Sequence, residues 1–411
     1  MHISDCAPAV LLRPLLVRDG SPASFIHRTY SRELWNEHGA WTLLLLLAAF
    51  GPWPAYILGA MIRATWLNGS AIRKRTGKSI ARQIGEQGVL AIVHAIPPRW
   101  YYTFELFDDD LRRRSGEYLQ RGETKRGVYA ILKRTDGVPL SPLTDKVAFA
   151  ARCREHDLRA VPVILALEHG EFTPGSDSDV SLAKEDLFIK PNHGKGGRGA
   201  ERWHYRQAGN YEGAGGETLS EADLVQHLRR LPFKEGLIVQ PRRVNHPDIA
   251  ELSNGALATV RIVTCRNEHG GFEGTNAVLR MAQGRNHVVD NFHAGGLAAR
   301  VDIESGVLGC ATDLGVRPGT GWRGKHPDSG AQIAGRKLPC WDETLALVVR
   351  AHAAFSDRIL IGWDVGLMTD GPELVEGNGG PDLDIVQRTH REPLGNARLG
   401  QLLAFHLRRL Q

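Results

Sequence analysis

The sequence predicts an α+β fold preceded by a helical N-terminal region. After about residue 125, short runs of β-branched and aromatic residues alternate with turns, and few helical segments interrupt them. Strands that follow one another in hairpins form antiparallel sheets, whereas an all-parallel sheet requires a helix after nearly every strand. The 411 residues suffice for two or three compact units of about 150 residues each.

Composition excludes several classes of protein. Hydrophobic residues make up 42% and charged residues 24% of the chain, the balance of a globular protein with a buried core. Only 7% of residues are aromatic, and no lysine or arginine stripe interleaves with them, so nucleic-acid binding is not expected. The formal net charge of +5 suits a phosphate-bearing ligand or an anionic lipid surface. The five cysteines form no CxxC pair and no signal peptide is evident, so we expect a cytoplasmic location.

An apolar stretch near the N-terminus is long enough to reach across a bilayer. Residues 41–62 carry no charge, and about 20 apolar residues span the hydrocarbon core. Pro52 and Pro54 lie at its centre and remove amide donors, which predicts an apolar hairpin of two half-helices of about ten residues each. Three arrangements remain open: a membrane span, a re-entrant or peripheral contact at the inner face of the cell membrane, and a hairpin buried against the catalytic domain.

Strands and helices follow in order after the helical region. The expected strands are Val161–Leu167, Leu187–Lys190, Leu237–Gln240, Ala258–Cys265, Glu273–Arg280, Gly296–Asp302, Ile359–Val365 and Glu373–Asn378. The expected helices are Lys146–His156, Ser220–Leu231 and Trp341–Phe355. Ser220 precedes Asp223 by three residues, which is a variant of the capping box. Asp342 and Glu343 place negative charge at the start of the last of these helices, where the helix dipole is positive.

A glycine-rich basic loop is the sharpest feature of the chain. A strand that ends on Lys190 runs into residues 191–199 (PNHGKGGRG). Glycines let backbone N–H groups approach a phosphate closely, and the lysine and arginine add positive charge. The loop lacks the GK[ST] of a Walker A motif and opens no Rossmann helix. A phosphate-binding loop and a flexible basic surface turn are the two interpretations.

An acidic hairpin near the C-terminus is the second feature. Residues 362–366 (GWDVG) and 374–378 (LVEGN) flank a TDGP turn. This turn sets Asp364 opposite Glu376, and Asn378 shares the face of Glu376 because side chains alternate along a strand. Such oxygen donors suit Mg²⁺ bound together with substrate phosphates, and two facing acids would otherwise repel each other. The alternative is a solvent-facing strand pair that carries acids by chance.

Loop and hairpin together resemble the ATP-grasp superfamily, and the resemblance runs from about Leu140 to the C-terminus. The chain is most similar to the sugar-transfer-associated, α-L-glutamate-ligase-related ATP-grasp proteins, and the similarity also touches the motif Pro97–Tyr102 (PPRWYY). It implies an ATP-grasp fold, in which two α+β subdomains clamp ATP. We therefore expect an N-terminal helical region over residues 1–110 and an ATP-grasp domain over residues 111–411, with a hinge near residues 237–241.

The resemblance implies a set of nucleotide-binding residues. Two lysines match those of the family, the second of which reaches the α-phosphate and the adenine edge. The glycine loop would close over the β- and γ-phosphates, and the hinge backbone would read adenine. The set is Lys146, Lys190, Gly194, Lys195, Gly196, Gly197, Gly199, Val239 and Gln240. Many relatives carry an acid after the hinge glutamine, where this chain has Pro241, which leaves the nearby ribose or adenine contact open.

Catalytic and metal-binding residues follow from the same resemblance. Arg261, Arg280 and Asn291 match residues near the transferred phosphate. His293 lies beside this motif and is expected to contact the substrate or to transfer a proton. The expected Mg²⁺ ligands are Asp364, Glu376 and Asn378. The cofactors implied are ATP and two Mg²⁺ ions, with Mn²⁺ as a substitute.

The activity implied is an ATP- and Mg²⁺-dependent ligation of a carboxylate to an amine through an acyl phosphate. The substrates would be an amino acid, a sugar acid or a lipid-linked sugar, and the family association suggests a sugar or exopolysaccharide precursor. Two alternatives remain open: an ATP-grasp phosphotransferase (kinase), and a non-catalytic ATP-binding scaffold of a polysaccharide assembly. The sequence contains no GxSxG motif and no evident Cys–His pair, so nothing in it points to a covalent protein nucleophile.

Overall fold

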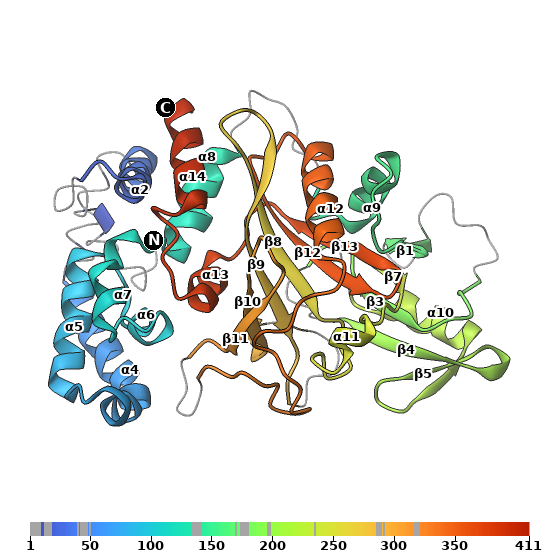
Figure 1. The fold of residues 1–411 in the computed structure, drawn as a ribbon. Coiled ribbons are helices and arrows are strands. Elements are labelled where there is room, and N and C mark those ends of the chain that lie inside the picture. The colour runs from blue at the N-terminus through green and yellow to red at the C-terminus, as the bar shows by residue number, and fades with distance from the viewer. Residues whose placement is uncertain are drawn as a thin grey trace.

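Two antiparallel sheets and a cluster of N-terminal helices make up the protein (Figure 1). The computed structural model describes residues 10–11, 19–38, 41, 48, 51–133, 142–168, 171–172, 181–194, 199–233, 236–284, 290, 292–315 and 321–410. Helices precede the first strand, and every ladder between the described strands is antiparallel. The predicted α+β class is therefore confirmed.

The first sheet has seven strands in the order β2-β1-β7-β3-β4-β5-β6. Its strands are β1 (Leu165–Glu168), β2 (Glu171–Phe172), β3 (Leu187–Pro191), β4 (Glu201–Arg206), β5 (Asn210–Gly213), β6 (Thr218–Ser220) and β7 (Leu237–Pro241). All five residues of β7 are buried between β1 and β3, which explains its nearly continuous apolar run. Leu224 and Leu228 of one helix cover this sheet.

The second sheet has six strands in the order β11-β10-β9-β8-β12-β13. Its strands are β8 (Thr259–Arg266), β9 (Phe272–Met281), β10 (Leu297–Val301), β11 (Leu308–Thr312), β12 (Leu360–Met368) and β13 (Gly371–Asn378). Hairpins join β8 to β9 and β12 to β13, and β12 returns beside β8 after a long excursion. This return places the acidic hairpin of β12 and β13 beside β8.

Helices lie mostly around the second sheet and at the N-terminal end. The α-helices are α2 (Pro22–His38), α4 (Trp53–Thr76), α5 (Ile80–Val93), α6 (Pro98–Thr103), α7 (Asp109–Arg113), α8 (Tyr129–Leu132), α9 (Lys146–Glu155), α10 (Glu221–Arg230), α11 (Pro247–Ala250), α12 (Trp341–Ala354), α13 (Leu383–His390) and α14 (Arg398–Arg409). The short 3₁₀ and π turns are η2 (Ser115–Glu117), η3 (Glu123–Val128), η4 (Gln207–Gly209) and η5 (Phe292–Ala294).

The two faces of the six-stranded sheet pack against different helices. Side chains at even positions of β8, such as Val260 and Ile262, join α9 and α12 in one core. Val263 and Cys265 point to the other face and pack against α8, α13 and α14. Figure 1 shows these helices on opposite sides of the sheet. Because side chains alternate along a strand, Arg261 lies on the face of α13, which becomes important for the site.

Most of the predicted strands and helices of this region are present within one to three residues of their expected ends. The prediction for Val161–Leu167 is wrong in its first half, since β1 begins at Leu165. Pro162 supplies no amide donor, so the ladder cannot extend through it. Val161 and Ile164 still donate their N–H groups, to the carbonyls of Leu374 and Val239 respectively. This segment therefore joins the two sheets instead of lengthening one of them.

Of the two predicted ten-residue half-helices, the first lies mostly outside the described residues, and the second is wrong in its length. Helix α4 begins at Trp53 and continues for 24 residues to Thr76. Pro52 is its N-cap and Pro54 lies in its first turn, where an amide donor has no partner inside the helix. Gly77 ends it in the left-handed conformation, with φ of 75°. Residues 42–47 lie outside the described part of the chain. Among the described residues, no helix is both long and apolar enough to cross a membrane.

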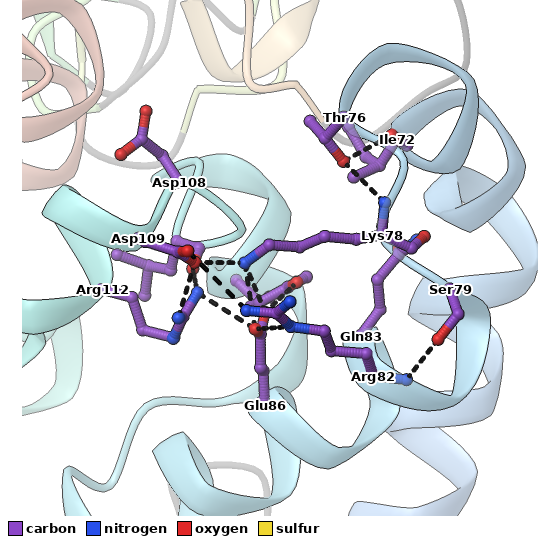
Figure 2. A network of polar contacts seen from close by, with 12 residues as sticks. Ile72, Thr76, Lys78, Ser79, Arg82, Gln83, Glu86, Asp108, Asp109 and Arg112 are labelled. Atoms are coloured by element: carbon purple, nitrogen blue, oxygen red, sulfur yellow. Dashed lines mark hydrogen bonds and ion pairs between the residues drawn. The ribbon is translucent and has the colours of Figure 1, made fainter.

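A polar network fixes the corner between α4 and α5 against α7 (Figure 2). Lys78 Nζ lies 2.9 Å from Glu86 Oε1 and 2.5 Å from Asp109 Oδ1. Arg82 and Arg112 approach the same Glu86 oxygen to 3.0 and 3.1 Å. Glu86 is thus surrounded by three cations. This charge cluster holds the three helices in one fixed arrangement.

The N-terminal helices are anchored to the part of the chain that holds the two sheets through a buried glutamine. Gln387 on α13 accepts the N–H of Leu119 at 2.9 Å and donates to the Leu119 carbonyl at 3.0 Å. Helix α2 packs against α14 nearby, and Ile26 of α2 belongs to the core on that side of the sheet. The helical region is therefore a built-in part of the fold and not a loosely tethered one.

We expect Glu86→Gln to weaken the fold and to flatten its pH dependence. Burial alone would raise the pKa of Glu86, but hydrogen bonds from Tyr101, Lys78 and Arg82 lower it below its ordinary value. A lowered pKa in the folded state stabilises the protein above the unfolded pKa of about 4.3, and this stability is lost as the pH falls through the folded value. Replacing the carboxylate should cost about 2 kcal/mol at pH 7.

Chemical denaturation at pH 7 and at pH 4 would measure both effects. Glu155→Gln, an exposed position on α9, is the matched control and should match the wild type at both pH values. A wild type and a Glu86→Gln variant with equal stabilities at pH 7 would contradict the assigned role of the cluster.

Candidate active site

One cavity lies where the two sheets meet, and it collects most of the residues that the sequence singles out. Its walls come from β3, β4 and β7 of the first sheet and from β8, β9, β12 and β13 of the second. The predicted site residues that line it are Lys146, Lys190, Gly194, Gln240, Arg261, Arg280, His293, Asp364, Glu376 and Asn378. The fold thus assembles one site from seven strands and several connections.

Six predicted residues are not among those that line the cavity. Four lie outside the described residues, namely Lys195, Gly196, Gly197 and Asn291. Gly199 follows the loop with φ of +74°, and a Cβ there would lie 2.7 Å from the Phe233 ring, so glycine is required. Val239 is buried within the sheet, where its carbonyl accepts the N–H of Ile164 at 2.8 Å. Of the predicted hinge, Gln240 and Pro241 line the cavity.

Three charged side chains of neighbouring strands form a buried ion cluster at the cavity floor. Arg261 is the register partner of Asp364, and its Nε and Nη2 both bond to the carboxylate, the latter at 2.7 Å. Arg280 Nη2 reaches the same carboxylate at 2.9 Å. Asp364 is only 2% exposed. Burial alone would raise its pKa, but Arg261 and Arg280 hold the pKa of Asp364 well below its usual range.

Glu376 faces Asp364 across the β12–β13 hairpin, as the sequence predicts. Burial and the neighbouring Asp364 carboxylate raise the pKa of Glu376, and Lys190 opposes only part of this shift. Asn378 donates its Nδ2–H to Glu376 Oε1 at 3.2 Å. A carboxyl group whose pKa is raised by a facing carboxylate is one that a cation would return to the ionised form.

The donors of this hairpin fit Mg²⁺. They are hard oxygens, two carboxylates and one amide, and they face the cavity together. Within the described ranges, no group of three histidine, cysteine or acidic side chains could hold a metal ion. Mg²⁺ keeps several waters and binds through one or two carboxylates plus substrate phosphates, so a partial protein shell is what it requires beside a nucleotide.

Two lysines bring positive charge to the opposite wall. Lys146 begins α9 and donates its Nζ–H to the carbonyl of Asn192 at 2.7 Å, while Asn192 Oδ1 accepts the Lys146 N–H at 2.9 Å. Burial lowers the pKa of Lys146. Burial also lowers the pKa of Lys190 to about 8; Glu376 opposes this shift and Lys146 adds to it. Two neighbouring ammonium groups in an enclosed site favour a multiply charged anion such as a polyphosphate.

Asp290 is a cavity residue that the sequence did not single out. Its Oδ2 accepts the N–H and the hydroxyl of Thr259 at 2.9 and 2.5 Å. Its other oxygen lies 3.3 Å from Arg280, so that this guanidinium bridges Asp290 and Asp364. Burial raises the pKa of Asp290. Its place one residue before the predicted Asn291 was the only signal in the sequence.

A histidine–carboxylate pair occupies the end of the cavity beside α13. His293 Nε2 lies 3.0 Å from Asp384 Oδ2, and Asp384 is 4% exposed in the first turn of α13. Asp382 precedes this helix, lines the cavity, and lies 2.9 Å from Lys125 Nζ. Sequence analysis selected His293 but neither carboxylate, nor Lys125, because these contacts join segments that are far apart in the chain.

Comparisons with known proteins give a family match and several similar structures. The family model described as "Sugar-transfer associated ATP-grasp" matches residues 133–399. Among solved structures, D-alanine–D-alanine ligase from Bacillus anthracis is similar with a TM-score of 0.36 and 10% identity, covering 65% of this chain and 68% of that chain. D-alanyl-alanine synthetase A from Vibrio cholerae is similar with a TM-score of 0.37 and 12% identity, and the match covers 65% of this chain and 65% of that chain. No curated protein matches.

A further similar structure is the L-amino acid ligase from Bacillus licheniformis. It has a TM-score of 0.40 and 11% identity, and the match covers 74% of this chain and 59% of that chain. This chain therefore spans between 59% and 68% of the length of the three enzymes. At these identities the likeness concerns the fold.

We expect Arg261→Met to be strongly destabilising, because it removes one of the two cations that face the buried Asp364. Breaking a buried ion pair on one side costs about 3–5 kcal/mol of unfolding free energy. The double variant Arg261→Met/Asp364→Leu removes both charges and should recover most of this loss. Urea denaturation without nucleotide measures the three proteins, and a loss below about 1 kcal/mol in the single variant would argue against the cluster.

Proposed function

The chain belongs to the sugar-transfer-associated ATP-grasp family, and from this membership we propose that it is an ATP- and Mg²⁺-dependent ligase joining a carboxylate to an amine. The observation that carries the proposal is the enclosure of Lys146 and Lys190 opposite the Asp364–Glu376 pair in a single cavity. Cations on one wall and acids on the other suit a nucleotide polyphosphate held together with a divalent metal ion.

In the proposed complex, the protein supplies fixed charges at both ends of the triphosphate. Lys146 and Lys190 would compensate phosphate oxygens, and the loop that begins at Gly194 would cover them. Asp364, Glu376 and Asn378 would hold Mg²⁺, which supplies neutralisation of the charge that develops on the transferred phosphoryl group. Gln240 and the residues after it would border the base.

The first chemical step would form an acyl phosphate. A substrate carboxylate oxygen attacks the γ-phosphorus, the bond from that phosphorus to the β–γ bridging oxygen breaks, and ADP leaves. Arg280 is 85% buried at its side chain and lies between Asp290 and Asp364. It is therefore held in place to stabilise negative charge on the transferred group and on the acyl oxygen.

The second step would form the amide. The amine attacks the acyl carbon, phosphate leaves, and the amine loses a proton. His293 lines the cavity and is held by Asp384 through its Nε2, so it is the group placed to accept this proton. The acceptor would be an amino acid, a sugar acid or a lipid-linked sugar, in keeping with the family's association with sugar transfer.

We also propose that the enzyme works at a membrane surface, as a lipid-linked acceptor would require. One face of the α4–α5 pair is apolar and exposed. Leu58, Ile62 and Trp66 on α4 are 51%, 54% and 81% exposed, and Val89 and Ile92 on α5 are 58% and 57% exposed. The two helices pack together through Ile57 and Ala91, and in this proposal the exposed side chains beside this contact act as one membrane-binding area.

Charge favours an anionic lipid surface as the partner of this area. On the same side of α4, Arg73 and Lys74 follow the apolar residues toward the C-terminal end and are exposed. A helix with an apolar first half and a basic second half on one face lies in the membrane interface instead of crossing it. The network around Glu86 fixes the corner between these two helices against α7 (Figure 2). This contact would be peripheral.

Glu376→Gln is expected to reduce Mg²⁺-dependent ATP turnover at least about 100-fold, because it removes a charge that holds the metal beside the transferred group. The raised pKa of Glu376 means that a neutral side chain is tolerated there, so the variant should remain folded. Turnover is measured by nucleotide analysis with Mg²⁺·ATP and pools of amino acids, amines and sugar acids, with Glu304→Gln, an exposed turn position, as the control.

The products decide between the proposed ligase and its alternatives. ADP and free phosphate that depend on both substrates support ligation, whereas a stable phosphorylated product would identify a kinase. AMP and pyrophosphate would contradict the acyl-phosphate route. ATP binding without turnover in any pool would favour a scaffold.

Ile62→Ser/Trp66→Ser is expected to weaken membrane binding more than tenfold, since each apolar side chain contributes about 1.5–3 kcal/mol when it leaves water. Flotation with phosphatidylcholine vesicles, with and without phosphatidylglycerol, measures the binding. Val244→Ser is the matched control, because Val244 is 58% exposed in the hinge region. A wild type that stays unbound from anionic vesicles would refute the membrane contact.

A further inference from the structure

A second cavity lies between the N-terminal helices and the catalytic part, and the PPRWYY motif lines it. Pro97, Arg99 and Trp100 of this motif form one wall. His27 and Tyr30 on α2 and the segment 120–126 form the others. Tyr101 and Tyr102 of the motif belong to the core of the N-terminal helices, but that core does not account for Arg99, which faces this cavity.

The lining of this cavity is strongly cationic. Arg99, Arg121, Lys125 and Arg126 contribute four positive charges, and Glu123 is the single carboxylate among the described residues that line it. That carboxylate is already engaged, with one oxygen 2.5 Å from His27 Nδ1 and the other accepting the N–H of Gln120 at 3.1 Å. Arg99 rests over the Trp100 ring, 4.8 Å from its centroid, and not against an acid. Asp382 pairs with Arg121 and Lys125 from outside the lining, so Arg99 is the cation of this wall that favours an anion.

A buried donor without a partner supports the same conclusion independently. The Gln120 side chain lines the cavity and is 9% exposed. Its Nε2 has no hydrogen-bond partner in the described part of the protein. A buried amide donor that stays unsatisfied costs free energy, so an acceptor atom supplied by a ligand would remove that cost. Oxyanions provide such acceptors.

One wall connects this cavity to the nucleotide site. Lys125 lines both cavities. Asp382, which lines the nucleotide cavity, lies 2.9 Å from Lys125 and 3.4 Å from Arg121 of the second cavity. The His293–Asp384 pair lies beside this wall, since both acids belong to the start of α13. A molecule that occupies the second cavity would therefore be next to the end of the active site where the amine reacts.

We propose that the second cavity binds an oxyanion of the acceptor substrate, a carboxylate or a phosphate, and so selects the acceptor. The proposal rests on the proposed function for the identity of the ligand as the acceptor. Arg99 and Gln120 supply the donors, and the wall of Lys125, Asp382 and Arg121 sets the distance to the reacting amine. The N-terminal helices then act as the specificity element of the ligase.

Equilibrium dialysis of the full chain tests the site directly. The nucleotide cavity is first saturated with Mg²⁺ and a non-hydrolysable ATP analogue, and radiolabelled inorganic phosphate or succinate is then added. The wild type should bind one anion per chain. Arg99→Gln and Gln120→Leu should each weaken this binding at least tenfold. Arg350→Gln, an exposed position on α12, is the matched control and should change nothing.

Each outcome decides the proposal. Tighter binding of phosphate points to a phosphorylated acceptor, and tighter binding of succinate points to a carboxylated one. No saturable binding of either anion, or equal binding by the wild type and both variants, would overturn the site. Dialysis requires no turnover, so a failed ligase assay leaves this result standing. Once an acceptor is known, Arg99→Gln should raise its KM while the KM for ATP and kcat stay unchanged.

Discussion

The contact between Arg261 and Asp364 is the constraint on which the rest of the site depends. The two residues are register partners in neighbouring strands, and both point to the same face of the six-stranded sheet. A one-residue slip of β12 would send Asp364 into the apolar core that holds Trp363 and replace it by that tryptophan. The charge pair and the core therefore enforce a single register, and this register sets where Glu376 of the next strand must lie.

In this arrangement the protein's own side chains do not fully compensate the charges of Glu376 and Lys190. Arg280 bridges two acids, and the pKa of Glu376 is raised by burial and by Asp364, which Lys190 and Arg261 offset only in part. On the opposite wall, the pKa of Lys190 is lowered for the complementary reason that burial disfavours its charge. A polyanion with a divalent cation would relieve both conditions at once. Binding of such a ligand would therefore favour the charged forms of both Glu376 and Lys190, which contributes to its affinity.

Sequence reasoning reached the parts of the site that depend on local rules. The hairpin partner of Asp364 follows from strand periodicity and a four-residue turn, and that pairing is confirmed. Lys125 and Asp384 were not predicted as site residues, because their contacts join segments that are far apart in the chain. The helix break expected at Pro52 is present, because α4 begins at Trp53 with Pro52 as its N-cap. The expected length of about ten residues was wrong, because Gly77 ends this helix and nothing close to the two prolines shows that.

The N-terminal helices gain a role when their two surfaces are considered together. Ile92 ends the exposed apolar face of α5, and only six residues separate it from Arg99 in the wall of the anion cavity. Trp100, the residue after Arg99, packs in the same helical core as Leu90. A lipid-linked acceptor has an apolar chain and an anionic group close to each other, and it would meet these two surfaces in that order. The short connection explains why an ATP-grasp domain would carry a rigid helical unit instead of a flexible membrane tether.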